Sequence, residues 1–286
     1  MRATEGIGPA GLFCRTVGEG PPIVVLHGGP EFDHTYLLPE LDRLAKFARL
    51  VYYDQRARGR SAGRPSEVGI DSEVDDVDRV RRELGFGSVA VLGHSWGGLL
   101  AMEYAVRHPE RISHLILANT APAAAPDWVL FREHLMRLRS SDEAERMEEI
   151  ASGAAFGAGD LEAEAAFNRL HFRPALRDTD HVERVVARLR THFSPESVLA
   201  ARAIGQRLSE ETWRSEGYDL LPRLAELDVP TLVLHGRDDF IPVALAERIA
   251  DAMPHAELVV LDCGHFAYLE EPEAFARHVE AFLRSG

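Results

Sequence analysis

The sequence predicts an α/β fold in which a mainly parallel β-sheet is flanked by helices and carries an inserted helical cap. Three observations predict this fold. Short apolar runs alternate with stretches of helical periodicity, which is typical of a parallel sheet. The runs are apolar on both faces, as expected of strands covered by helices on both sides. The alternation stops between residues 122 and 226 and then resumes, which indicates an insertion.

Six apolar runs are expected to form the parallel strands. They cover residues 21–28, 49–54, 88–93, 114–119, 231–236 and 256–262. Near the start of the chain, residues 12–17 have the character of an antiparallel edge strand. The strands before the insertion and the two after it should belong to one sheet, because all share the same two-sided apolar pattern.

Helices are expected between the strands. Asp71 is expected to cap a helix that buries Val74 and ends at Gly85. A last helix follows Pro272 and turns Phe275, with Val279 and Phe282, inward. These apolar stripes belong to the core of the sheet domain.

The chain is therefore expected to divide into a first core part at residues 1–121, a helical cap at 122–226 and a second core part at 227–286. The Ala/Gly-rich stretch 151–160 within the cap is expected to be a loop. The cap should cover the C-terminal edge of the sheet, where open α/β sheets bind ligands.

Composition limits the possible partners. The 286 residues are 45% hydrophobic, enough for a large core in a soluble protein, and the formal net charge of −14 repels phosphate backbones and anionic membranes. Nucleic acid and membrane partners are therefore not expected. Cys14 and Cys263, the two cysteines, suggest no disulfide framework and no zinc site. The N-terminus lacks the apolar segment of a signal peptide, so a cytoplasmic location is expected.

Ser95 is the candidate nucleophile. It lies in the segment Gly-His-Ser-Trp-Gly, between a predicted strand and a predicted helix. A serine on a sharp strand-to-helix turn requires small residues two positions before and two positions after it, and Gly93 and Gly97 occupy those positions. The context therefore favours a nucleophile over a simple turn residue.

A serine hydroxyl needs a base, and the base needs a third group that fixes its tautomer. His265 follows the last predicted strand, and Asp238 and Asp239 follow the strand before it. The spacing after Gly236 selects Asp239 as the acid. Asn119, at the end of the fourth apolar run, offers no carboxylate as an alternative.

Acyl transfer also needs backbone donors for the developing oxyanion. The glycine turn that contains Gly29 and the start of the helix after Ser95, at Trp96, are expected to supply two amides. His27, His94 and His235 lie at strand ends and are expected to shape the site, while the other histidines pack or face solvent. No metal site and no cofactor are expected.

These segments together resemble the α/β-hydrolase superfamily, and in particular its proline iminopeptidase-like branch. The motifs are "LHGGP", "YYDQRARGRS", "GHSWGG", "HGRDD" and "CGHFAYLEEPEAF", and they span nearly the whole chain apart from the cap. The resemblance implies the same catalytic set: Ser95 as nucleophile, His265 as base, Asp239 as its orienting acid, and the Gly29 and Trp96 amides as oxyanion donors.

The chain departs from that branch at three positions. Glu31 stands where the branch usually has glycine after "HGGP", and Ala57 replaces the glycine of "DQRG". Some relatives have a glutamate directly after the catalytic acid, where this chain has Phe240, which is expected to contact the substrate. Such peptidases hold the free amine of the substrate with carboxylates of the cap. The candidates for that role here are Glu210, Glu211 and Glu216.

Three functions are compatible with these features. The first is a serine aminopeptidase that acts on short peptides with an N-terminal proline or small apolar residue. A carboxylesterase for short-chain esters is the second, and a cap lined by Trp128, Phe131 and Trp213 would suit it. A non-catalytic ligand-binding homologue is the third and is disfavoured by the complete triad. The natural substrate and the oligomeric state stay open.

Overall fold

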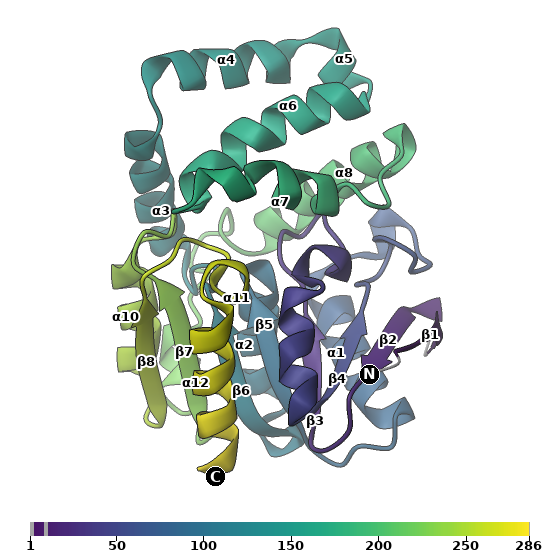
Figure 1. Cartoon of the computed structure of the whole chain (residues 1–286), viewed down its shortest axis with the longest axis vertical. Coiled ribbons are helices and arrows are strands. Elements are labelled where there is room, and N and C mark those ends of the chain that lie inside the picture. Colours follow the sequence, from purple (N-terminus) through teal and green to yellow (C-terminus); the bar gives the residue numbers. More distant parts are fainter. Residues whose placement is uncertain (1–2, 9–10, 286) are drawn as a thin grey trace.

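The computed structural model describes residues 3–8 and 11–285. Within these residues the core is an eight-stranded sheet in the order β1-β2-β4-β3-β5-β6-β7-β8 (Figure 1). The strands from β4 to β8 along this order run parallel, whereas β1 and β2 pair antiparallel. The predicted fold class is confirmed. The strands are β1 Thr4–Ile7, β2 Phe13–Val17, β3 Pro22–Leu26, β4 Arg49–Tyr53, β5 Val89–His94, β6 Ile112–Ala118, β7 Thr231–Gly236 and β8 Ala256–Leu261.

The antiparallel side of the sheet differs from the expectation in one respect. β2 is antiparallel as predicted, but it is not the edge, because β1 pairs outside it with Thr4 opposite Thr16. All four residues of β1 are exposed. A strand that buries no side chain leaves no hydrophobic alternation in the sequence, so β1 escaped prediction.

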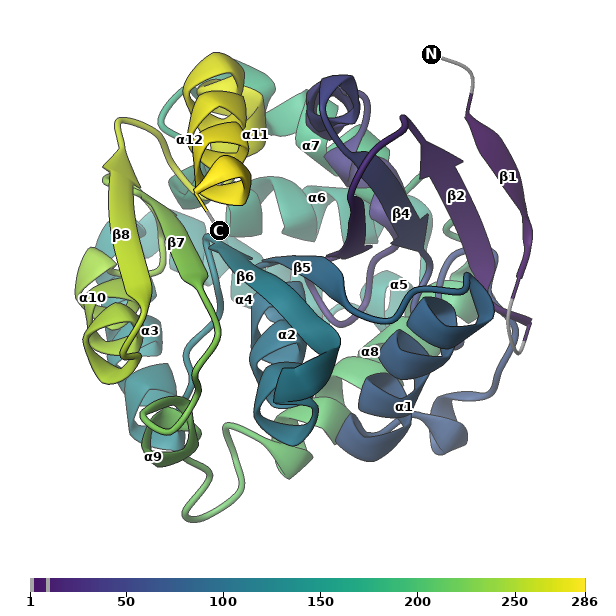
Figure 2. The ribbon, with the colours of Figure 1, turned by 90° about the horizontal axis from the view of Figure 1, so that it is seen from below.

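Helices cover both faces of the sheet (Figure 2). Those packed on the sheet are α1 Ile70–Glu83, α2 Trp96–Arg107, α9 Leu221–Leu224, α10 Val243–Ala252, α11 Ala267–Glu270 and α12 Pro272–Arg284. One face packs against α1, α2 and α10, and the other against α12 and the 3-10 segment Glu40–Lys46. Further 3-10 turns are His34–Leu37, Pro65–Glu67, Pro109–Arg111, Arg173–Ala175 and Thr179–His181.

Two of the predicted helix signals hold and one is wrong. Gly85 lies just past the end of α1 with a φ of 78°, and Phe275 of α12 is buried, both as expected. Asp71 does not cap α1. It lies inside the first turn and pairs with Arg107 at 2.7 Å, while the N-cap is Gly69, one residue before the helix.

The insertion between β6 and β7 is helical. Besides α9, its helices are α3 Ala125–Leu138, α4 Ser141–Ser152, α5 Ala154–Gly157, α6 Leu161–Phe172, α7 Val182–Leu189 and α8 Pro195–Glu211. Figure 1 shows α4 to α8 stacked above one end of the sheet. The expectation of a loop at residues 151–160 is wrong, because α4 continues to Ser152 and α5 follows at once. Alanine, the strongest helix former, outweighs the glycines there.

Across the described residues, none of the helices combines the length and the apolar character that a bilayer span requires.

Candidate active site

Ser95 occupies a strained turn between β5 and α2. Its backbone has a φ of 55° and a ψ of −120°, a conformation that L-residues rarely adopt. Both flanking glycines are required by space. A Cβ on Gly93 would lie 2.1 Å from the carbonyl oxygen of Gly97, and a Cβ on Gly97 would lie 2.1 Å from that of Leu26. The turn thus has the tight geometry expected for a serine presented as a nucleophile.

Asp239 and His265 meet at the ends of β7 and β8. Nδ1 of His265 lies 3.0 Å from Oδ1 and 3.1 Å from Oδ2 of Asp239. Burial alone would raise the pKa of the Asp239 carboxyl. The neighbouring His265 and His235, together with the hydrogen bonds from His265 and the Ile241 amide, instead hold that pKa below its ordinary value. Asp239 is therefore an anion beside the imidazole.

Asn119 adds a contact that sequence reasoning missed. Its side-chain amide donates to Oδ2 of Asp239 at 2.8 Å and to the carbonyl oxygen of Gly264 at 3.1 Å. The φ of Asn119 is 46°, so the residue turns sharply as it leaves β6. Asp238, by contrast, pairs with Arg177 at 3.5 Å. Asn119, which offers no carboxylate of its own, therefore supports the carboxylate of Asp239.

A buried hydrogen-bond chain ties the Ser95 turn to the His265 loop. The amide of Gly28 donates to the hydroxyl of Tyr36 at 2.6 Å, and that hydroxyl lies 2.7 Å from Nδ1 of His94. Nε2 of His94 lies 2.9 Å from the carbonyl oxygen of His265. Because a carbonyl only accepts, Nε2 carries the hydrogen and Tyr36 donates to Nδ1. Burial lowers the pKa of His94 to about 3, so its ring is neutral.

The backbone of His265 is also held from the insertion. Its amide donates to the carbonyl oxygen of Ala175 at 2.6 Å, and Ala175 ends the 3-10 turn that follows α6. A Cβ on Gly264 would lie 2.4 Å from the same oxygen. The loop that carries the imidazole is therefore clamped between the sheet domain and the insertion.

A cavity of about 480 Å³ opens between the sheet and the insertion. Ser95 and His265 both line it, without a hydrogen bond between their side chains in this structure. Much of its wall is aromatic, and the indole rings of Trp128 and Trp213 stack face to face with centroids 4.1 Å apart. The predicted lining residues Trp128, Phe131, Trp213 and Phe240 all reach it.

The two predicted oxyanion donors line the same cavity. The amide of Gly29 forms no hydrogen bond with another backbone group of the described chain. Trp96 is the first residue of α2, so its amide is one of the helix donors that have no partner within the helix. Both amides are thus available to an oxygen atom next to Ser95.

One part of the cavity wall is acidic. Glu31 lines it beside Gly205 of α8, where a Cβ would lie 2.1 Å from Oε1 of Glu31. Burial raises the pKa of Glu31 to about 7, and the nearby Glu164 contributes to this rise. Glu164 pairs with Arg202, whereas Glu31 forms no ion pair with any described residue. A cation in the cavity would find its partner in Glu31.

The cap glutamates selected from the sequence lie outside the cavity lining. Glu211 accepts from the amide of Ile70 at 2.8 Å, Glu210 accepts from Gln206 at 2.9 Å, and Glu216 is exposed. The lining positions of α6 went unrecognised, although they follow a helical spacing. They are Glu164, Phe167, Asn168, His171 and Phe172.

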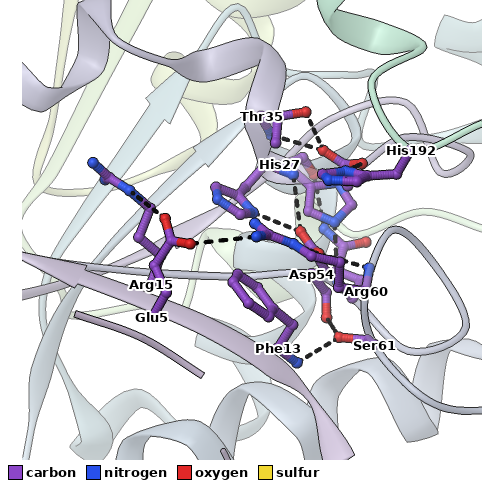
Figure 3. A network of polar contacts seen from close by, with 12 residues as sticks. Glu5, Phe13, Arg15, His27, Thr35, Asp54, Arg60, Ser61 and His192 are labelled. Atoms are coloured by element: carbon purple, nitrogen blue, oxygen red, sulfur yellow. Dashed lines mark hydrogen bonds and ion pairs between the residues drawn. The ribbon is translucent and has the colours of Figure 1, made fainter. Parts of the chain in front are cut away.

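Beside the cavity, Asp33, His34 and Asp54 bring together groups of the kind that bind metal ions. The carboxylate oxygens of Asp33 and Asp54 already accept hydrogen bonds. Nδ1 of His34 lies 2.6 Å from Asp54, and Asp33 accepts hydrogen bonds from His192 at 2.8 Å and from the Thr35 amide. Figure 3 shows Thr35, His192 and Asp54 in this network of polar contacts. Because His192 lies between α7 and α8, this cluster connects the insertion to the sheet domain.

Comparisons with known proteins agree with this architecture. The family model described as alpha/beta hydrolase fold matches residues 21–272. A putative carbamate hydrolase RutD of Rhizobium rhizogenes is 31% identical, covering 92% of each chain. A proline iminopeptidase of Lactobacillus delbrueckii subsp. lactis is 30% identical over 100% of this chain and 99% of its own. The crystal structure of VinJ superposes with a TM-score of 0.78 at 27% identity, covering 99% of this chain and 98% of VinJ. The chain therefore belongs to the alpha/beta hydrolase fold family, with proline iminopeptidases among its relatives.

Proposed function

We propose that the chain is a serine hydrolase that works through an acyl-enzyme intermediate. Nε2 of His265 takes the proton of Ser95, whose oxygen attacks an ester or amide carbonyl. The amides of Gly29 and Trp96 stabilise the oxyanion, and His265 returns the proton to the leaving group. Water, activated by the same histidine, then releases the acyl group. The pairing of Asp239 with Nδ1 of His265 supports this proposal most directly, because it leaves Nε2 free to act as base.

Within this class we infer an aminopeptidase resembling the proline iminopeptidases. Glu31 supports this choice, since it is a carboxylate in the cavity wall without an ion-pair partner among the described residues. A substrate ammonium group would pair with it and would favour its ionised form. Relatives named proline iminopeptidase align over the full length of the chain. The substrate class is then a short peptide with a free N-terminal amine.

A carboxylesterase is the second candidate. The stacked rings of Trp128 and Trp213, with Phe131 and Phe240 nearby, favour apolar acyl or alcohol groups. An esterase would have no use for Glu31, and removing that carboxylate would leave ester cleavage intact. A ligand-binding homologue without turnover is the remaining alternative.

Fluorophosphonate labelling tests the nucleophile. The wild-type protein should be labelled at Ser95 and Ser95→Ala should not, and equal labelling of the two would sink the serine mechanism. The ligand-binding alternative predicts no labelling of a correctly folded wild-type chain.

Parallel assays separate the two enzyme candidates. An aminopeptidase should cleave proline anilide, and acetylation of the proline nitrogen should abolish turnover. Glu31→Gln should raise KM for the anilide by about tenfold or more, the value of one charge-assisted contact, while leaving an aryl ester unaffected. Glu210→Gln is the matched control, because Glu210 lies outside the cavity. Rapid ester cleavage with inert anilides would instead identify a carboxylesterase.

A further inference from the structure

His171 lines the cavity at a point away from the acidic wall. It lies on the face of α6 that also carries Glu164. The two positions are seven residues apart in the helix, which separates their side chains by roughly 10 Å along the axis. The ring of His171 lies 5.9 Å from that of Phe240, and Phe240 lies 4.5 Å from the ring of His265. His171 is therefore a polar group on the Phe240 and His265 side of the cavity.

The partner of His171 fixes its tautomer. Nη2 of Arg139 lies 3.1 Å from Nδ1 of His171. A guanidinium only donates, so Nδ1 accepts and Nε2 carries the hydrogen. Burial, followed by the charge of Arg139, lowers the pKa of His171 to about 3, so the ring stays neutral over the working range of pH. Within the described chain, this Nε2–H has no hydrogen-bond partner.

Arg139 supplies a charge that the protein does not neutralise locally. Its side chain is partly buried, its Nε is buried without a partner, and it forms no ion pair with a carboxylate of the described residues. Glu143 is the acid whose charge acts on Arg139, but its carboxylate is already bonded to Arg173 and Ser140. A partly buried cation without a counter-ion is costly, and an anion next to His171 would offset that cost.

The proposed mechanism indicates which part of the substrate lies at this end of the cavity. His265 protonates the leaving group in the proposed mechanism, so the leaving group lies on the side of Phe240 and His171. The acyl part then lies toward the loop of Gly29 and Glu31. We propose that His171, with Arg139 behind it, binds a carboxylate carried by the leaving group of the substrate. If the proposed aminopeptidase function holds, the substrate class narrows to dipeptides with a free C-terminal carboxylate.

The test compares leaving groups with and without this charge. Prolyl-alanine, prolyl-alaninamide and proline anilide are assayed on wild type, His171→Phe, Arg139→Gln and the exposed control Arg137→Gln. Wild type should prefer the dipeptide over its amide by about tenfold or more, the value of a charge-assisted hydrogen bond, mainly through KM. Both site variants should lose this preference, with a larger loss on the dipeptide than on the anilide, and Arg137→Gln should behave as wild type. An equal loss on all three substrates, or no preference in wild type, overturns the proposal.

A pair of esters keeps this test independent of the peptidase proposal. Acetoxybenzoate carries a carboxylate on its leaving group, and phenyl acetate does not. If peptides are inert but wild type prefers acetoxybenzoate in an Arg139-dependent way, the carboxylate site stands and the aminopeptidase proposal falls. If neither series shows a preference for the charged leaving group, the carboxylate site is refuted. The rate of fluorophosphonate labelling of Ser95 confirms that each variant is folded.

Discussion

The side-chain amide of Asn119 donates a hydrogen bond of 2.8 Å to Oδ2 of Asp239, whose Oδ1 lies 3.0 Å from Nδ1 of His265. The acid of the proposed triad is thus held from the opposite side by a neutral donor. Asn119→Gly removes this donor while tolerating the φ of 46° at the position. We expect kcat/KM to fall by about tenfold, the value of one hydrogen bond to a charged group. Steady-state kinetics on the best substrate check this, and an unchanged kcat/KM would mean that Asn119 has no positioning role.

Asp239 is expected to orient the imidazole. Asp239→Asn should lower kcat by about 10⁴, because the amide no longer holds the required tautomer. Asp238→Asn is the matched control and should retain parental turnover, since Asp238 pairs with Arg177 at the surface. Turnover numbers and fluorophosphonate labelling rates measured on both variants check the assignment. Comparable losses in the two variants would contradict it.

Tyr36 joins three backbone segments through one hydroxyl. Tyr36→Phe would leave the Gly28 amide and Nδ1 of His94 buried without partners, at a cost of about 1–3 kcal/mol in the free energy of unfolding. Activity should fall as well, because His94 would hold the His265 loop less firmly. Tyr268→Phe removes a single longer bond of 3.3 Å and should cost less. Urea unfolding of both variants gives the comparison, and the reverse ranking would count against the chain of hydrogen bonds.

Glu31 should make the protein less stable as the pH rises. Burial keeps Glu31 protonated in the folded chain up to a pKa of about 7, whereas the unfolded chain loses this proton near 4.5. Between these values the folded state binds more protons, so the free energy of unfolding decreases with pH. Glu31→Gln should therefore gain about 1 kcal/mol on wild type between pH 5 and pH 8, with allowance for contact with solvent through the cavity. Urea titrations at the two pH values measure it, and a parallel shift in both proteins would refute it.

His192 should link the insertion to the sheet domain in a pH-dependent way. The hydrogen bond to Asp33 raises the pKa of His192 above its ordinary value of 6.5. The stabilisation is then complete below pH 6.5 and is lost as the pH rises through the higher, folded-state value. Limited proteolysis of residues in α7 and α8 should become faster across that range in wild type. In His192→Gln the rate should change far less, and an identical pH profile in both proteins would rule out the link.

Most of the parallel strands could be predicted because they are buried on both faces and leave a continuous apolar run, as in β5 and β7, whereas the edge strand β8 is only partly buried. The same logic failed for β1, which buries nothing, and at α1, where Gly69 rather than Asp71 precedes the helix. Chain order and turn chemistry brought Ser95, Asp239 and His265 to one edge of the sheet in prediction. In the structure Ser95 and His265 line one cavity, and Asp239 contacts His265.

The rest of the cavity was beyond sequence reasoning for a physical reason. A carboxylate on a surface helix and one in a cavity wall belong to the same residue type, so Glu210 and Glu164 could not be told apart without the packing of α6 and α8. Asn119 and His171 depend in the same way on neighbours far along the chain. Only the three-dimensional arrangement identifies which polar groups have partners.

The hydrogen bond from the His265 amide to the carbonyl of Ala175 limits how substrates can enter. If the insertion swung away as one rigid body, it would pull on the loop that holds His265, the proposed base. A substrate can enter without displacing the His265 ring only if the moving part of the insertion pivots beyond the 3-10 turn Arg173–Ala175. The same hydrogen bond constrains engineering. A different insertion joined to this sheet must place a carbonyl oxygen where that of Ala175 lies, whatever its side chains are.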